Sequence, residues 1–136
     1  MPNNTLFRAD INETIELPED MQWTDEFEWS DLAQATPQYT RGGALVIQQS
    51  TKLAGRPVTL GGEWVWVNRG DYKKLQEWTA IPQLQMTLTL HNANPARTFT
   101  VTFRTHEGAI DCRPVVFTAP ELDDAPYTGE IRLIII

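Results

Sequence analysis

The stretch from Leu84 to Arg104, LQMTLTLHNANPARTFTVTFR, alternates apolar and polar residues in two runs separated by a polar turn. Because period-2 alternation sends successive side chains to opposite faces of a strand, this stretch predicts a long antiparallel hairpin. One face of the hairpin is apolar, with Leu84, Met86, Leu88, Leu90, Phe99, Val101 and Phe103. The other face is dominated by Thr87, Thr89, Thr98, Thr100 and Thr102, which carry no evident catalytic chemistry.

The length and composition indicate one folded domain. A chain of 136 residues is long enough for one core and is expected to form a single domain over residues 1–136. Hydrophobic residues make up 41% of it, which is typical of globular proteins. No apolar run approaches the roughly 20 residues of a membrane span, and the start lacks a signal-peptide pattern, so we expect synthesis and folding in the cytoplasm without a membrane anchor. The single cysteine, Cys112, is expected to be a buried structural thiol.

Charge is unevenly distributed along the chain, whose net charge is −7. Residues 1–35 hold nine acids and one base, for a net charge of −8, whereas residues 41–113 hold nine bases and five acids, for a net charge of +4. The bases are scattered, so we expect no nucleic-acid specificity. An acidic segment beside a basic body suits head-to-tail contact between copies, although a solvated acidic face explains the same pattern.

The acidic, aromatic segment 1–35 is expected to pack on the β body or to extend from it. Within and after it, we predict a strand at Thr14–Leu17, a turn at Pro18–Asp20, a strand at Asp25–Trp29 and a loop at Ser30–Tyr39. Residues 44–51, ALVIQQST, follow Gly42-Gly43 and predict a strand that is either protected at an edge or covered on both faces.

The second half contains one helix among further strands. Residues 57–60 predict a short strand, and Trp64–Val67 predicts a strand with two apolar faces. Asp71–Ala80 predicts a helix with Asp71 as N-cap and with Tyr72, Leu75 and Trp78 on the buried face. After the hairpin, we predict strands at Ala109–Thr118 and at Glu130–Ile136. This order indicates a mainly β fold, a β-sandwich or small barrel of about eight to ten strands with one short packed helix.

The search for catalytic or ligand-binding motifs finds none. His91 and His106 lack partners at the spacing of a metal site, and no nucleophile elbow, P-loop or dinucleotide fingerprint occurs. Carboxylate pairs such as Glu26 and Glu28 are expected to be solvated loop residues and not the catalytic pair of a glycosidase. We therefore expect no catalytic, cofactor-binding or metal-binding residues, no cofactor and no enzyme activity.

The aromatic residues admit more than one interpretation. Trp23, Phe27, Trp29, Trp64 and Trp66 suit a small β core or a subunit interface, and they also suit the stacking surface of a carbohydrate-binding module. Together with Ile134 and Ile136 of the apolar terminal strand, they form the candidate subunit interface: Trp23, Phe27, Trp29, Trp64, Trp66, Ile134 and Ile136.

The order of these segments resembles small tail proteins of tailed bacteriophages. The residues that carry the resemblance are LPEDMQWTDEFEWSDLAQ, GGALVIQQSTKLAGRPVTLGG, the short helix, the hairpin MTLTL to RTFTVTFR and the terminal apolar strand. Strands, one central helix and a long hairpin are similar to the tail-tube fold, which tube proteins share with the ring-forming domain of distal tail (baseplate hub) proteins. The resemblance covers about residues 15–136.

The resemblance implies a structural virion protein without catalytic residues. It implies a homo-oligomeric ring, commonly of six copies, that continues the tail tube at the tip or baseplate and contacts the tube and other tail-tip proteins. The second, carbohydrate-module-like domain of many distal tail proteins has no room in 136 residues. The threonine face is the candidate lumen-facing or neighbour-facing surface. The alternative function is a carbohydrate-binding β-sandwich module that recognises host-surface glycans.

Overall fold

A computed structural model describes residues 3–62, 65–91, 95–116 and 122–136, and it is mainly β with one α-helix, as predicted. Nine strands form the main sheet, within the range expected: β1 (Asn4–Arg8), β2 (Glu13–Leu17), β3 (Gln22–Trp23), β8 (Pro57–Gly61), β9 (Val67–Asn68), β10 (Met86–Leu90), β11 (Arg97–Phe103), β12 (Ile110–Pro114) and β13 (Pro126–Ile135). The remaining elements are two separate strand pairs and three helical segments: β4 (Leu32–Gln34), β5 (Gln38–Tyr39), β6 (Leu45–Val46), β7 (Gln49–Thr51), α1 (Arg69–Thr79) and the 3₁₀ turns η1 (Glu26–Glu28) and η2 (Thr105–Glu107).

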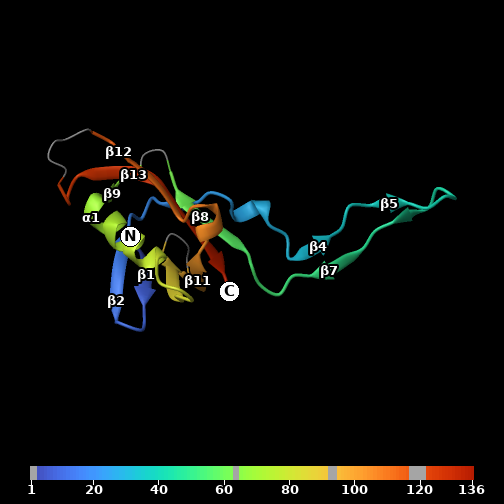
Figure 1. Ribbon diagram of the computed structural model, residues 1–136, viewed down its shortest axis with the longest axis horizontal. Coiled ribbons are helices and arrows are strands. Elements are labelled where there is room, and N and C mark those ends of the chain that lie inside the picture. The colour runs from blue at the N-terminus through green and yellow to red at the C-terminus, as the bar shows by residue number, and fades with distance from the viewer. Residues whose placement is uncertain (1–2, 63–64, 92–94, 117–121) are drawn as a thin grey trace.

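The main sheet is organised around the long strand β13. Its strand order is β2-β1-β10-β11-β13-β8-β3, and all its pairings are antiparallel. The first half of β13 pairs with β12 and β9, and the second half pairs with β11 and β8. The predicted apolar terminal strand is therefore the centre of the sheet (Figure 1).

The predicted hairpin is confirmed, with β10 and β11 as its arms. Met86 is opposite Val101 and Leu88 is opposite Phe99, so apolar residues meet on one face. Met86, Leu88, Leu90, Val101 and Phe103 are buried, whereas the threonines between them are half-buried or exposed. Strand β1, which the sequence analysis missed, pairs with the free side of β10.

Helix α1 covers the apolar face of the sheet through the three residues predicted for that role. Tyr72, Leu75 and Trp78 are buried among the core residues. The helix begins two residues earlier than predicted, at Arg69, and Asp71 lies in its first turn. Asp71 is therefore not the N-cap.

Asn4 is a buried polar residue that joins three parts of the fold. Its side-chain amide donates hydrogen bonds to the carbonyl oxygens of Pro18 (3.4 Å) and Met21 (3.3 Å). Its Oδ1 accepts a hydrogen bond from the backbone N–H of His91 at 2.8 Å. Because a buried amide without partners is costly, these bonds fix β1 between the β2–β3 turn and the end of β10.

Gly129 allows β12 and β13 to approach closely. A Cβ atom at this position would lie 2.0 Å from the carbonyl oxygen of Asp111 and 2.6 Å from the Cα atom of Cys112. No side chain fits at that distance, so the residue at this point of β13 has to be glycine.

Two local predictions in the N-terminal third are wrong. Asp25–Trp29 is not a strand, because Glu26–Glu28 form η1 while the Asp25 and Glu26 side chains bond to Thr59 and Arg97. Ser30–Tyr39 is not a loop, since it contains β4 and β5.

Candidate assembly surface

The most distinctive feature of the molecule is a hairpin that projects far beyond the main sheet (Figure 1). We call residues 31–52 the arm. Its strands pair as β4 with β7 and as β5 with β6, and neither pair joins the main sheet. The residues predicted as a strand covered on both faces, or protected at an edge, form the returning half of this arm and are exposed instead.

The arm has a glycine turn at its tip and a bulge along its length. Thr40 donates its backbone N–H to the carbonyl oxygen of Ala44 at 2.8 Å, and Gly43 adopts a φ of 86° that favours glycine. Gln34 pairs with Gln49 and Gln38 pairs with Val46. The outgoing strand therefore has four residue steps between these pairs, whereas the returning strand has three. One extra residue on the outgoing strand separates the two paired sections, near Pro37, which has no N–H to donate.

The arm exposes apolar side chains without charged ones around them. Every residue from 34 to 51 is exposed, and Tyr39 has 76% of its surface accessible. Its cross-strand partner Leu45 lies on the same face, and Val46 and Ile47 are also exposed. Residues 32–51 contain one charged residue, Arg41. Because an isolated two-stranded hairpin is marginally stable in water, this composition is typical of a segment that binds a protein surface.

The base of the arm is fixed to the body by charged and aromatic contacts. The Lys52 ammonium lies 3.8 Å from the centre of the Trp29 ring, and the Trp29 indole donates to Asp31 at 2.8 Å. Glu26 accepts two hydrogen bonds from the Arg97 guanidinium at 3.0 and 3.2 Å. The first two contacts join the ends of the arm to Trp29, and the third joins η1, just before the arm, to β11.

The candidate interface residues divide by burial. Phe27 is 92% exposed on η1, and Trp66 and Ile136 are about half exposed. Trp29 and Ile134 are half-buried, whereas Trp23 is buried in the core against Phe99. Trp64 lies outside the described residues. The sequence analysis missed Tyr39, Leu45 and Val46, although a Gly-Gly pair between two uncharged runs is itself a hairpin signal.

The predicted threonine face extends across strands from both ends of the chain. Thr89 lies between Thr98 and Thr5 in one row, and Thr87 lies opposite Thr100. Thr98 and Thr100 are exposed, and Thr87, Thr89 and Thr102 are half-buried. The five threonines therefore share one outward, uncharged surface of the sheet.

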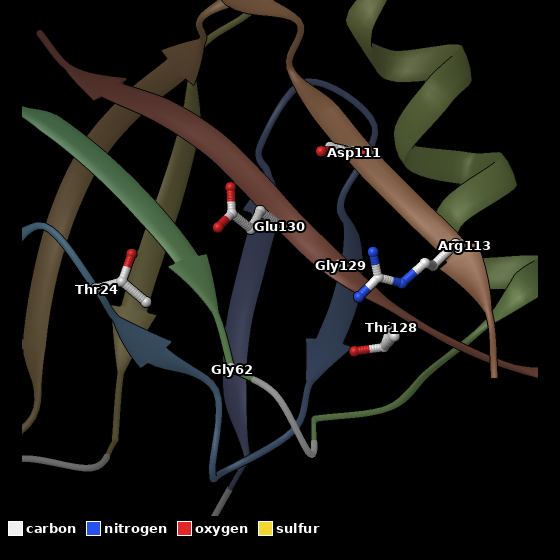
Figure 2. Close-up of a pocket in the computed structure, with 7 residues that line it drawn as sticks. All are labelled: Thr24, Gly62, Asp111, Arg113, Thr128, Gly129 and Glu130. Carbon is white, nitrogen blue, oxygen red and sulfur yellow. The ribbon is translucent and has the colours of Figure 1, made fainter.

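A polar depression lies beside the close approach of β12 and β13 (Figure 2). Its volume is about 560 Å³, and its described lining residues are Thr24, Gly62, Asp111, Arg113, Thr128, Gly129 and Glu130. The Arg113 side chain extends across the strand toward Gly129, whereas the Glu130 carboxylate points toward the opposite side (Figure 2). The Arg132 guanidinium lies 3.2 Å from Glu130 and 3.6 Å from Asp111, so both carboxylates have a charged partner.

The reactive side chains of the described residues are considered as metal ligands and as titratable groups. No three His, Cys, Asp or Glu side chains among them gather as metal ligands. Burial raises the pKa of the Cys112 thiol, which favours its unreactive protonated form. Burial also raises the pKa of Tyr72. Within the same residues, no helix is long and apolar enough to span a membrane.

Comparison of the chain with protein-family models, with curated proteins and with solved structures gives no match.

Proposed function

We propose that this chain is a structural component of a bacteriophage tail, whose copies join into a ring at the tail tip or baseplate that continues the tail tube. The observation that carries the proposal is the arm, a projecting hairpin with exposed apolar residues and almost no charge. Exposed apolar surface of this kind is typical of a segment that binds another protein.

The resemblance to tail proteins supplies the context for this arm. The one packed helix and the hairpin β10–β11 accord with the order of elements that the resemblance implies. In this proposal the ring has six copies, and its neighbours are the tail tube and other tail-tip proteins. The threonine face would line the lumen or contact a neighbour, where small β-branched side chains stiffen the strands without strong adhesion.

A carbohydrate-binding module is the alternative, and the exposed ring of Trp66 favours it. Two other exposed aromatic residues in the described part of the chain, Phe27 and Tyr39, lie on separate elements, η1 and the arm. None of the described lining residues of the polar depression is aromatic. The two functions are distinguished by titrating the protein with sugars while monitoring tryptophan fluorescence, which changes only if glycans bind.

The proposal is tested by electron microscopy and light scattering of the purified chain over a range of concentrations. Rings of fixed diameter are expected. A Tyr39→Ser, Leu45→Ser variant should lose the rings and keep the melting temperature, because both side chains lie outside the core. A strict monomer at high concentration would contradict the proposal.

A further inference from the structure

An uncharged trough lies beside the C-terminal end of α1. It consists of two adjoining depressions, of about 330 and 350 Å³, that share Gln83, Leu84 and Thr102. Its described lining residues are Thr79, Ala80, Ile81, Pro82, Gln83, Leu84, Gln85, Thr102, Phe103, Thr105 and Ile136. None of these side chains is charged, although 21% of the chain is Asp, Glu, Lys or Arg.

The trough mixes apolar and polar side chains at its surface, where Gln83, Gln85 and Thr105 are exposed. Ile81 and Ile136 are exposed there, and Leu84 and Phe103 form part of its floor as buried core residues. When a partner covers apolar side chains that contact water at the rim of a concavity, their burial stabilises the complex.

Gln83 provides a second, independent observation at the centre of the trough. Its φ is 58°, in the left-handed region that is unfavourable for a residue with a Cβ atom. The strained backbone lies between the end of α1, where Ile81 donates to the Trp78 carbonyl oxygen at 3.2 Å, and the start of β10. Such strain concentrates at binding surfaces, where the surrounding structure holds it in place.

We infer that the trough receives the arm of a second copy of this chain, an inference that rests on the proposed ring function. Residues 32–51 of the arm carry one charge and the described lining of the trough carries none, so almost no ion hydration is lost when the two surfaces meet. The arm of the same molecule cannot fill the trough, because the arm carries its β5–β6 tip away from the body and from α1 (Figure 1).

The contact is heterologous, since the arm and the trough are different surfaces. A heterologous contact repeats from copy to copy and forms a ring if the rotation closes. Each copy then gives one arm and receives one. Burial of the arm's few apolar side chains at one contact does not by itself exceed the cost of association. Ring closure, in which every copy is held at two sites, makes the assembly stable.

The inference is tested by disulfide cross-linking in a Cys112→Ser background, which removes the native thiol. Two single variants, Tyr39→Cys in the arm and Gln83→Cys in the trough, are mixed and oxidised. We expect a covalent heterodimer that neither variant forms alone. The matched control replaces the exposed Gln22 of β3 by Cys and should give at least tenfold less product with Tyr39→Cys.

The possible outcomes separate the inference from the function on which it rests. Homodimers of Tyr39→Cys alone would indicate arm-to-arm contact and would overturn the inference. Normal rings without the Tyr39–Gln83 cross-link would also overturn it and leave the ring function standing. A chain that remains monomeric by light scattering would refute both.

As a second variant, Gln85→Arg should weaken assembly at least tenfold, whereas Gln22→Arg should not, because only Gln85 lines the trough.

Discussion

At the scale of single residues, the fold depends on one position that has no side chain, Gly129, and on one buried polar side chain, Asn4. Gly129 lets β12 and β13 come together where a side chain would collide with the Asp111 carbonyl group. Asn4 does the opposite, because its amide fills a buried gap and bonds to Pro18, Met21 and His91. Neither requirement is visible in the local sequence, since each depends on a residue more than ten positions away.

Replacing Gly129 by alanine should destabilise the protein by about 3 kcal/mol or more, because the added methyl group forces β12 away from β13. Urea denaturation measures this as a loss in the free energy of unfolding. The matched control is Gly42→Ala at the arm tip, where the nearest atom to a new Cβ is 4.0 Å away and stability should change little. Equal stability of the two variants would show that the sheet tolerates separation at Gly129.

At the scale of elements, a charged pair joins η1, just before the arm, to β11. The two hydrogen bonds from Arg97 hold the pKa of Glu26 below its ordinary value of 4.5. A carboxyl group with a lowered pKa in the folded state stabilises the fold above its unfolded pKa and loses that effect as the pH falls through its folded value. The contribution of Glu26 is therefore present at neutral pH and disappears below about pH 4.5.

A Glu26→Gln variant should be less stable than the native chain by about 1 kcal/mol at pH 7, and the difference should shrink as the pH falls below about 4.5. Chemical denaturation at several pH values measures the difference. Glu28→Gln is the control, because Glu28 is an exposed residue of the same turn. A Glu26→Gln deficit that stays constant down to pH 3 would show that the lost stability does not come from this carboxylate charge.

At the scale of the whole molecule, charge complementarity acts within one chain. The acidic segment 1–35 and the basic body, whose opposite charges suggested contact between copies, are joined inside the molecule. Glu13 pairs with Lys74 at 3.0 Å, and Glu26 pairs with Arg97 at 3.0 Å. Part of the charge that could guide a neighbouring copy is therefore already neutralised, whereas the trough and residues 32–51 of the arm, which carry one charge, lie outside these ion pairs.

We therefore expect that a higher salt concentration does not weaken assembly. If the arm binds the trough, raising sodium chloride from about 0.1 M to about 1 M should preserve or strengthen the oligomer, since apolar contacts are not screened. A head-to-tail contact between acidic and basic surfaces should instead dissociate as the Debye length shortens. Sedimentation velocity at the two salt concentrations distinguishes them, and dissociation at high salt would favour the contact between charged surfaces.

The sequence by itself determined the elements whose signals are local. Period-2 alternation defined the hairpin β10–β11, and the spacing of Tyr72, Leu75 and Trp78 defined the buried face of α1. It also indicated an extended conformation for residues 44–51. Only the tertiary structure decided that these residues project into solvent, because alternation specifies two faces of a strand and says nothing of what covers them. The trough could not be predicted from the sequence either, because it combines the end of α1 with Thr102 and Ile136, which lie far apart in the chain. Its proposed contact with the arm of another copy likewise depends on tertiary structure.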